Sequence, residues 1–171
     1  MIIEFIKKLF NKRKKVMIDL STAPRGVRNN NPGNIDYNPL NKWKGLNPKS
    51  KELDSRFCVF ISAEYGIRAL LILLRNYEKK YKLNTVRKII NRWAPSSENN
   101  TSSYVNHVAK QMEVGIDDVL DLSNREVLIS LAKAIVVHEN GVQPYCDAIY
   151  QSGYELISGR KSYESINWFL C

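Results

Sequence analysis

The chain has little cysteine and no long hydrophobic run, and both shortages restrict what it can be. Its three cysteines, Cys58, Cys146 and Cys171, are an odd number at wide spacing, so neither a disulfide framework nor a zinc site is expected. No apolar stretch approaches the roughly 20 residues that span a bilayer. The first fifteen residues make a poor secretory signal, because their basic cluster follows the apolar residues and no small-residue cleavage site is present. We therefore expect synthesis in a reducing cytoplasm, without export by the general secretory route.

Acidic residues are also scarce relative to basic ones. The chain has 17 Asp and Glu against 26 Lys and Arg, a net charge of +9, and residues 1–15 alone hold six basic residues and one Glu. Such a balance favours a polyanionic partner, which could be nucleic acid, an anionic lipid surface or an acidic wall polymer. The apolar residues of 1–15 fall on one helical face, which suits a helix lying on an anionic membrane surface or on a partner protein. The alternative is a solvated tail whose apolar side docks on its own domain.

What is present is material for one compact domain. A length of 171 residues with 44% hydrophobic residues is ample for a core. The pattern changes at residues 21–24, which predicts a basic amphipathic segment over 1–24, a domain over 25–160 and a tail over 161–171.

Hydrophobic spacing predicts an α+β fold dominated by helix. Asn, Pro and Gly crowd residues 25–45, which predicts a structured loop or a small hairpin region. Alternating apolar residues over 56–61 predict a strand beside it, so that one small β region is expected. Helical spacing then predicts five helices, at about residues 62–81, 85–93, 101–115, 123–139 and 145–157.

Glu139 is the first candidate for chemistry. Gly141 and Pro144 predict that the most apolar helix ends here. The negative end of the helix dipole and partial burial both disfavour an ionised carboxylate at this position. A carboxylic acid that keeps its proton suits general-acid cleavage of a glycosidic bond. The alternative is a solvent-exposed Glu without a role.

Glu64 is the second candidate. It is expected in the first turn of its helix, where the dipole favours the carboxylate and a capping role is the simplest interpretation. If functional, it would act as a base, or would orient the substrate or Arg68. Glu98 lies in a polar loop and could contact sugar hydroxyls or fix a turn. Trp43, in a turn-rich segment, is the tryptophan expected to be most exposed.

Several other classes of site lack their signature. His107 and His138 have no metal-ligand spacing with each other or with a cysteine, and no phosphate-binding loop or nucleophile elbow occurs. Neither a metal nor a cofactor is therefore expected. Basic residues recur between Arg68 and Arg92 and could track phosphates, but no nucleic-acid-reading motif accompanies them. A solvated helix face explains them as well, so nucleic acid is not the expected partner.

The motifs together resemble a family of phage-encoded proteins. The stretches that carry the resemblance are RGVRNNNPGNI at residues 25–35, EYGIRA at 64–69, WAP at 93–95 and HENGVQPY at 138–145. The resemblance spans about residues 25–158. Members look like lysozyme-fold enzymes that degrade peptidoglycan, often described as virion-associated lytic transglycosylases, while many are described only as virion proteins. Such a protein is made in the bacterial host cytoplasm and is carried in the virion or acts in the periplasm and cell wall.

The resemblance implies cleavage of the glycan strand of peptidoglycan between N-acetylmuramic acid and N-acetylglucosamine, in host entry or lysis. In lysozyme-like enzymes the helix ending in the catalytic Glu precedes the asparagine-containing β segment, whereas here it follows. A lysozyme-like fold with the segment order of a circularly permuted chain is therefore expected. The identity of the acid stays open between Glu139 and Glu64. The expected substrate contacts are Asn30, Asn31, Asn34, Trp43, Tyr65, Arg68, Glu98, Tyr104, Asn140, Gln143 and Tyr145.

Two reaction types and one non-enzymatic role remain at this point. A lytic transglycosylase needs one Glu, which serves first as acid and then as base. A muramidase needs a second carboxylate, for which Glu64, Asp36 and Asp54 are available. The other alternative is a virion structural protein without catalysis, which binds glycan, membrane or capsid neighbours.

Overall fold

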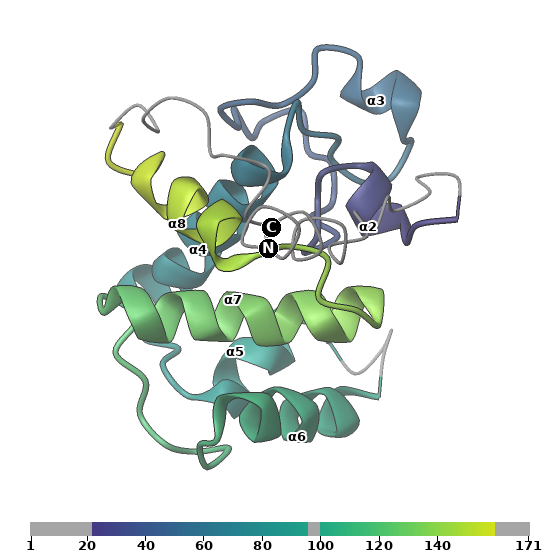
Figure 1. Ribbon diagram of the computed structural model, residues 1–171. Helices are drawn as coiled ribbons and strands as arrows, with labels where there is room; N and C mark the ends of the chain where they lie inside the picture. Colours follow the sequence, from purple (N-terminus) through teal and green to yellow (C-terminus); the bar gives the residue numbers. More distant parts are fainter. Residues whose placement is uncertain (1–21, 96–99, 160–171) are drawn as a thin grey trace, which may run out of the picture.

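A computed structural model describes residues 22–95 and 100–159. In these ranges the chain is mostly helical (Figure 1), which confirms the prediction of a predominantly helical domain. The helices are α2 (Arg25–Arg28), α3 (Ser50–Leu53), α4 (Ala63–Tyr81), α5 (Val86–Trp93), α6 (Thr101–Met112), α7 (Arg125–Asn140) and α8 (Asp147–Glu155). The predicted segments 1–24 and 161–171 lie almost entirely outside the described residues.

Helix α7 forms the centre of the fold. Figure 1 shows it between α5 and α6 on one side and α4, α8 and the α2–α3 region on the other, and it contacts α2, α4, α6 and α8. Because α7 packs against other helices on two sides, most of its surface is apolar. The fully buried residues Leu128, Leu131 and Ile135 lie at helical spacing along it. The position of α7 brings its C-terminal end beside α2 and the turn-rich segment.

The turn-rich segment and its neighbour form no regular strand within the described residues. Two isolated antiparallel bridges, Asp36 with Phe57 and Leu46 with Phe60, replace the strand predicted over 56–61. Side chains take over part of the backbone pairing: the buried amide of Asn31 donates to the carbonyls of Ile35 and Cys58. The predicted β region is therefore reduced to these bridges, and the short helices α2 and α3 in this part of the chain were not predicted.

A buried carboxylate ties the turn-rich segment together. Asp54 accepts hydrogen bonds from the guanidinium of Arg25, the amide of Asn29 and the backbone N–H groups of Arg56 and Phe57. The Arg25 hydrogen bond is the largest of the effects that hold the pKa of Asp54 far below its usual range. Asp54 was considered as a second catalytic carboxylate, and here it joins α2 to the residues that follow α3.

The five longer helices follow the predicted order, with shifted ends. Helix α6 ends at Met112, and the next residue, Glu113, adopts a left-handed conformation two residues before the expected Gly115. Asn124, not Ser123, caps α7 by accepting from two backbone N–H groups, and α8 is shorter than predicted. None of the helices in the described part of the chain is long and apolar enough to cross a membrane. Cys58 is buried and free, whereas Cys146 is disulfide-bonded, although the sequence suggested no disulfide framework.

Candidate active site

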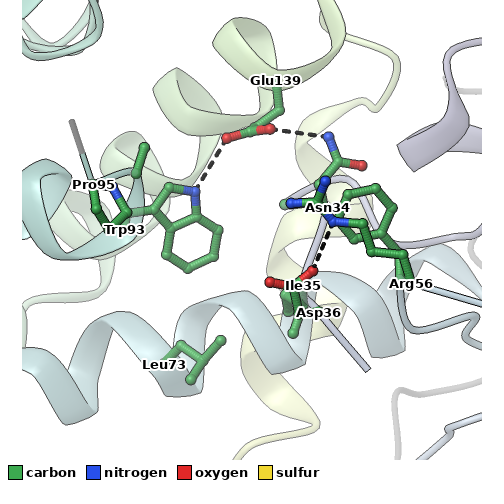
Figure 2. Close-up of a pocket in the computed structure, with 11 residues that line it drawn as sticks. Asn34, Ile35, Asp36, Arg56, Leu73, Trp93, Pro95 and Glu139 are labelled. Carbon is green, nitrogen blue, oxygen red and sulfur yellow. Dashed lines mark hydrogen bonds and ion pairs between the residues drawn. The ribbon is translucent and has the colours of Figure 1, made fainter. Parts of the chain in front are cut away.

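Glu139 lies one residue before the end of α7, where the central helix reaches an open cleft. Gly141 terminates the helix with a positive φ of 70°, as the sequence predicted. The side chain is half-buried. It lines a cleft of about 700 Å³, with Gly33, Asn34, Ile35, Asp36, Arg56, Phe57, Leu73, Trp93, Ala94 and Pro95 (Figure 2).

Three donors from three parts of the chain hold the Glu139 carboxylate. Trp93 Nε1 and the Tyr104 hydroxyl donate to Oε1 at 3.2 and 2.8 Å, and Asn34 Nδ2 donates to Oε2 at 2.9 Å. An indole N–H and an amide NH₂ can only donate. Oε1 therefore accepts two of these hydrogen bonds and Oε2 accepts one.

Tyr104 is fixed as a donor by its surroundings. Burial, reinforced by the nearby charge of Glu139, raises the pKa of Tyr104 well above its usual value, so the hydroxyl keeps its proton. Its ring stacks on His138 with centroids 3.5 Å apart and planes 12° from parallel. Burial, together with the neighbouring His107, lowers the pKa of His138. A mostly neutral imidazole therefore covers one face of the tyrosine ring at neutral pH.

Asp36 and Arg56 form the opposite side of the cleft (Figure 2). Arg56 Nε lies 3.2 Å from Asp36 Oδ1, and the two side chains are 57% and 70% exposed. The Arg56 guanidinium also lies 4.7 Å from the Phe57 ring centroid. Asp36 is thus a second carboxylate in the same cleft, in contact with solvent and with a cation.

The three expected asparagines of the turn-rich segment occupy different environments. Asn34 reaches the cleft and contacts Glu139. Asn31 is fully buried and uses both its donors and its acceptor within residues 31–58. Asn30 adopts a φ of 50°, and its amide donates to the carbonyl of Phe60. Of the three, only Asn34 lines the cleft.

The remaining expected contacts lie mostly away from the cleft. Asn140 is buried and donates to the carbonyls of Pro32 and Val136, which joins the end of α7 to the turn-rich segment. Arg68 donates to the Leu156 carbonyl and joins α4 to the end of α8. Gln143 accepts from the Tyr150 hydroxyl. Trp43 and Tyr65 are partly buried against the core, and Glu98 lies outside the described residues.

Glu64 is not among the residues that line the cleft. It lies in the first turn of α4, and its charge contributes, after burial, to the raised pKa of Tyr145. Glu64 and Tyr145 are therefore close to each other, and neither contacts Glu139 within the described structure.

Trp93 is the site residue that reasoning from the sequence alone did not single out. It lay in one of the stretches that carried the family resemblance, but core packing is the usual role of a tryptophan. Its position at the last residue of α5, directly before Ala94-Pro95, was the available signal. A tryptophan at a helix end can turn its N–H toward a cleft while its ring stays packed.

Comparison with known proteins shows the family to which the chain belongs. No family model matches it. Protein P5 of Pseudoalteromonas phage PM2 is 36% identical over 138 residues, which cover 80% of this chain and 83% of that protein. The chain belongs to the Protein P5 family. Membership in this family supports a bacteriophage context, in agreement with the expectation of a phage protein.

Proposed function

We propose that this chain is a phage enzyme that cleaves the glycan strand of peptidoglycan between N-acetylmuramic acid and N-acetylglucosamine, with Glu139 as the acid. The observation that carries the proposal is the position of the Glu139 carboxylate, at the end of the central helix and facing an open cleft. The proposed place of action is host entry or lysis, which is compatible with the bacteriophage context of the Protein P5 family. The net positive charge of +9 suits an anionic wall polymer.

The hydrogen bonds of Glu139 support a role in which geometry must be fixed. General-acid catalysis requires a carboxyl group held within hydrogen-bonding reach of the bond that breaks. The donors on Oε1 fix the plane of the carboxyl group, and Oε2 keeps one site for a proton beside the Asn34 amide. Glu139 Oε2 is therefore the atom that would deliver the proton.

The proposed reaction needs one carboxyl group. Glu139 gives its proton to the glycosidic oxygen, and that oxygen leaves with the electron pair of the broken bond to C1. The C6 hydroxyl of the same sugar then attacks C1 and returns its proton to the Glu139 carboxylate. The product is a 1,6-anhydro sugar, no water is consumed and the acid is restored.

The exposure of Asp36 and its ion pair with Arg56 favour this single-carboxylate reaction over hydrolysis. A muramidase needs a second carboxylate that acts as nucleophile or activates water. Asp36 is the other carboxylate that lines the cleft, but it is 70% exposed and paired with Arg56. Glu64, the alternative acid, is not part of the cleft lining. We therefore assign the acid to Glu139 and the reaction to the lytic transglycosylase type.

The proposed fold class is lysozyme-like with a permuted segment order. Support comes from the arrangement of the cleft, in which a carboxylate at the end of an apolar helix faces a turn-rich segment with two β bridges. The turn-rich segment precedes the acid-bearing helix in this chain, as expected for the permuted order.

Digestion of purified sacculi tests the proposal. The intact chain should release soluble anhydro-muropeptides, whereas reducing-end products would indicate a muramidase. Glu139→Gln should lower the rate by about 10²- to 10⁴-fold while the fold is kept, since the amide oxygen of the new side chain can still accept from Trp93 and Tyr104. Glu126→Gln, an exposed position in the first turn of the same helix, is the matched control. Absence of release by the intact chain, or full activity of Glu139→Gln, would contradict the proposal.

A second candidate function rests on the same three hydrogen bonds. Because they satisfy the Glu139 carboxylate within the protein, the residue could serve to join α5, α6 and α7 to the turn-rich segment in a non-catalytic virion protein. That function predicts that Glu139→Gln lowers thermal stability and that the intact chain releases nothing from sacculi. Stoichiometric incorporation into phage particles would then be the expected finding.

A further inference from the structure

A row of side chains on α4 leads away from the cleft. Leu73, Tyr77 and Tyr81 are spaced four residues apart, so they lie on the same face of the helix in successive turns. Leu73 lines the cleft, and Figure 2 shows it with Trp93 on the side away from Arg56. Eight residues at about 1.5 Å of rise each carry the row about 12 Å beyond Leu73.

Trp93 joins this row to the acid. Its indole N–H donates to Glu139, and its ring meets the Tyr77 ring edge-on, with centroids 6.4 Å apart and planes at 63°. Both rings are partly buried against the core, and their contact joins the side chain that donates to Glu139 to the tyrosines on α4.

A cation covers the far end of the row. The Arg92 guanidinium lies 3.9 Å from the Tyr81 ring centroid and 5.3 Å from that of Tyr77. In residues 22–95 and 100–159, ion pairs occupy Arg25, Arg56, Arg87, Arg125 and Lys133, but not Arg92. Arg92 is exposed, and Tyr81 is 50% exposed. The two rings hold the guanidinium in place while its charge stays available to an anion.

We propose that Arg92, Tyr77 and Tyr81 form a second binding surface for the same anionic glycan strand, adjoining the cleft. The inference rests on the proposed glycan-cleaving function. A strand in the cleft that continues past Trp93 meets aromatic rings, which suit sugar rings, and then a guanidinium, which suits the carboxylates that peptide-bearing wall glycan carries. The surface binds polymer that extends beyond the bond to be cut.

Co-sedimentation with purified insoluble sacculi tests this surface. The chain carrying Glu139→Gln is used, so that bound polymer is not cut during the measurement. Adding Arg92→Gln should weaken sedimentation about tenfold, and adding Tyr81→Ala should weaken it similarly. Tyr81→Phe should keep the affinity, because the ring remains. Lys110→Gln, which removes an exposed charge on α6, should also have no effect.

The outcomes separate this inference from the function on which it rests. If Glu139→Gln alone sediments with sacculi and Arg92→Gln and Tyr81→Ala leave its affinity unchanged, the second surface is refuted and the cleft retains its role. Failure of Glu139→Gln to sediment at all, together with no release by the intact chain, refutes both. Equal weakening by Lys110→Gln would show that total charge acts and would also refute a defined surface. Unchanged melting temperatures establish that each variant is folded.

Discussion

The side-chain amide of Asn34 donates a 2.9 Å hydrogen bond to Glu139 Oε2 across 105 positions of sequence. Asn34 adopts a left-handed backbone conformation with φ of 48°, which Asn and Gly tolerate better than other residues. The backbone conformation of the turn thus aims the amide at the carboxylate. This single contact connects the turn-rich segment with the candidate acid.

Asn34→Gly should lower glycan cleavage about tenfold, because the carboxyl group loses one of the groups that orient it. The backbone conformation is retained, so the melting temperature should change little. Asn41→Gly, at an exposed turn position, serves as the control and should cleave at the normal rate. The rate of glycan release from sacculi and the melting temperature are measured for each variant. An unchanged rate for Asn34→Gly would show that the amide does not position Glu139.

Tyr104→Phe removes the hydroxyl that donates to Glu139 Oε1 and keeps the ring that stacks on His138. We expect a loss of about 5- to 30-fold in kcat/KM, the equivalent of one hydrogen bond of about 1–2 kcal/mol to a carboxylate. A rate loss without unfolding would be visible in steady-state assays on soluble glycan fragments. If the rate is normal and only stability falls, the hydrogen bond has a structural role alone.

Asp54→Asn should destabilise the fold by about 2–4 kcal/mol at pH 7, because a buried carboxylate with several donors loses its charge. The folded-state pKa of Asp54 lies below the unfolded value of about 3.9. Its stabilisation is therefore complete above that pH and is lost as the pH falls below it, so the variant and the original chain should converge in acid. Urea unfolding at several pH values measures both effects. Asp117→Asn, which breaks an exposed pair with Arg87, should leave the free energy of unfolding nearly unchanged.

Gly66→Ala should prevent the chain from folding normally. A Cβ at this position would lie 1.8 Å from the backbone oxygen of Asn30, so α4 could not pack against the turn-rich segment. A Cβ at Gly141 would meet nothing within 4 Å, and Gly141→Asn should be tolerated because Asn accepts a positive φ. Soluble expression and circular dichroism distinguish the two variants, and a normally stable Gly66→Ala would contradict this packing.

The helices could be predicted because their signals are local. Apolar spacing located α4 and α7, and the glycine at 141 located the end of α7 within one residue. The strand predicted over 56–61 was wrong: Cys58, Val59 and Phe60 are all buried, within a loop held by the Asn31 amide, so burial does not alternate along this segment. A side-chain amide that replaces a strand partner leaves no periodic signal in the sequence.

The placement of Glu139 could be predicted because a reactive side chain lies beside a helix end that the sequence marks. The position of Glu139 followed from its distance to Gly141, whereas its donors come from residues 34, 93 and 104, which no spacing connects. Asn31 and Asn34 look alike in sequence, yet one is fully buried within its own loop and the other reaches the cleft. Such differences depend on the path of the whole chain.

The three donors to Glu139 all precede it in the chain, so during synthesis the carboxylate is the last part of the cluster to leave the ribosome. A chain that stops before α7 contains the turn-rich segment, Trp93 and Tyr104, but lacks both the acid and the helix against which α4 and α6 pack. Under the proposed function, wall-cleaving activity appears only when translation has passed the central helix.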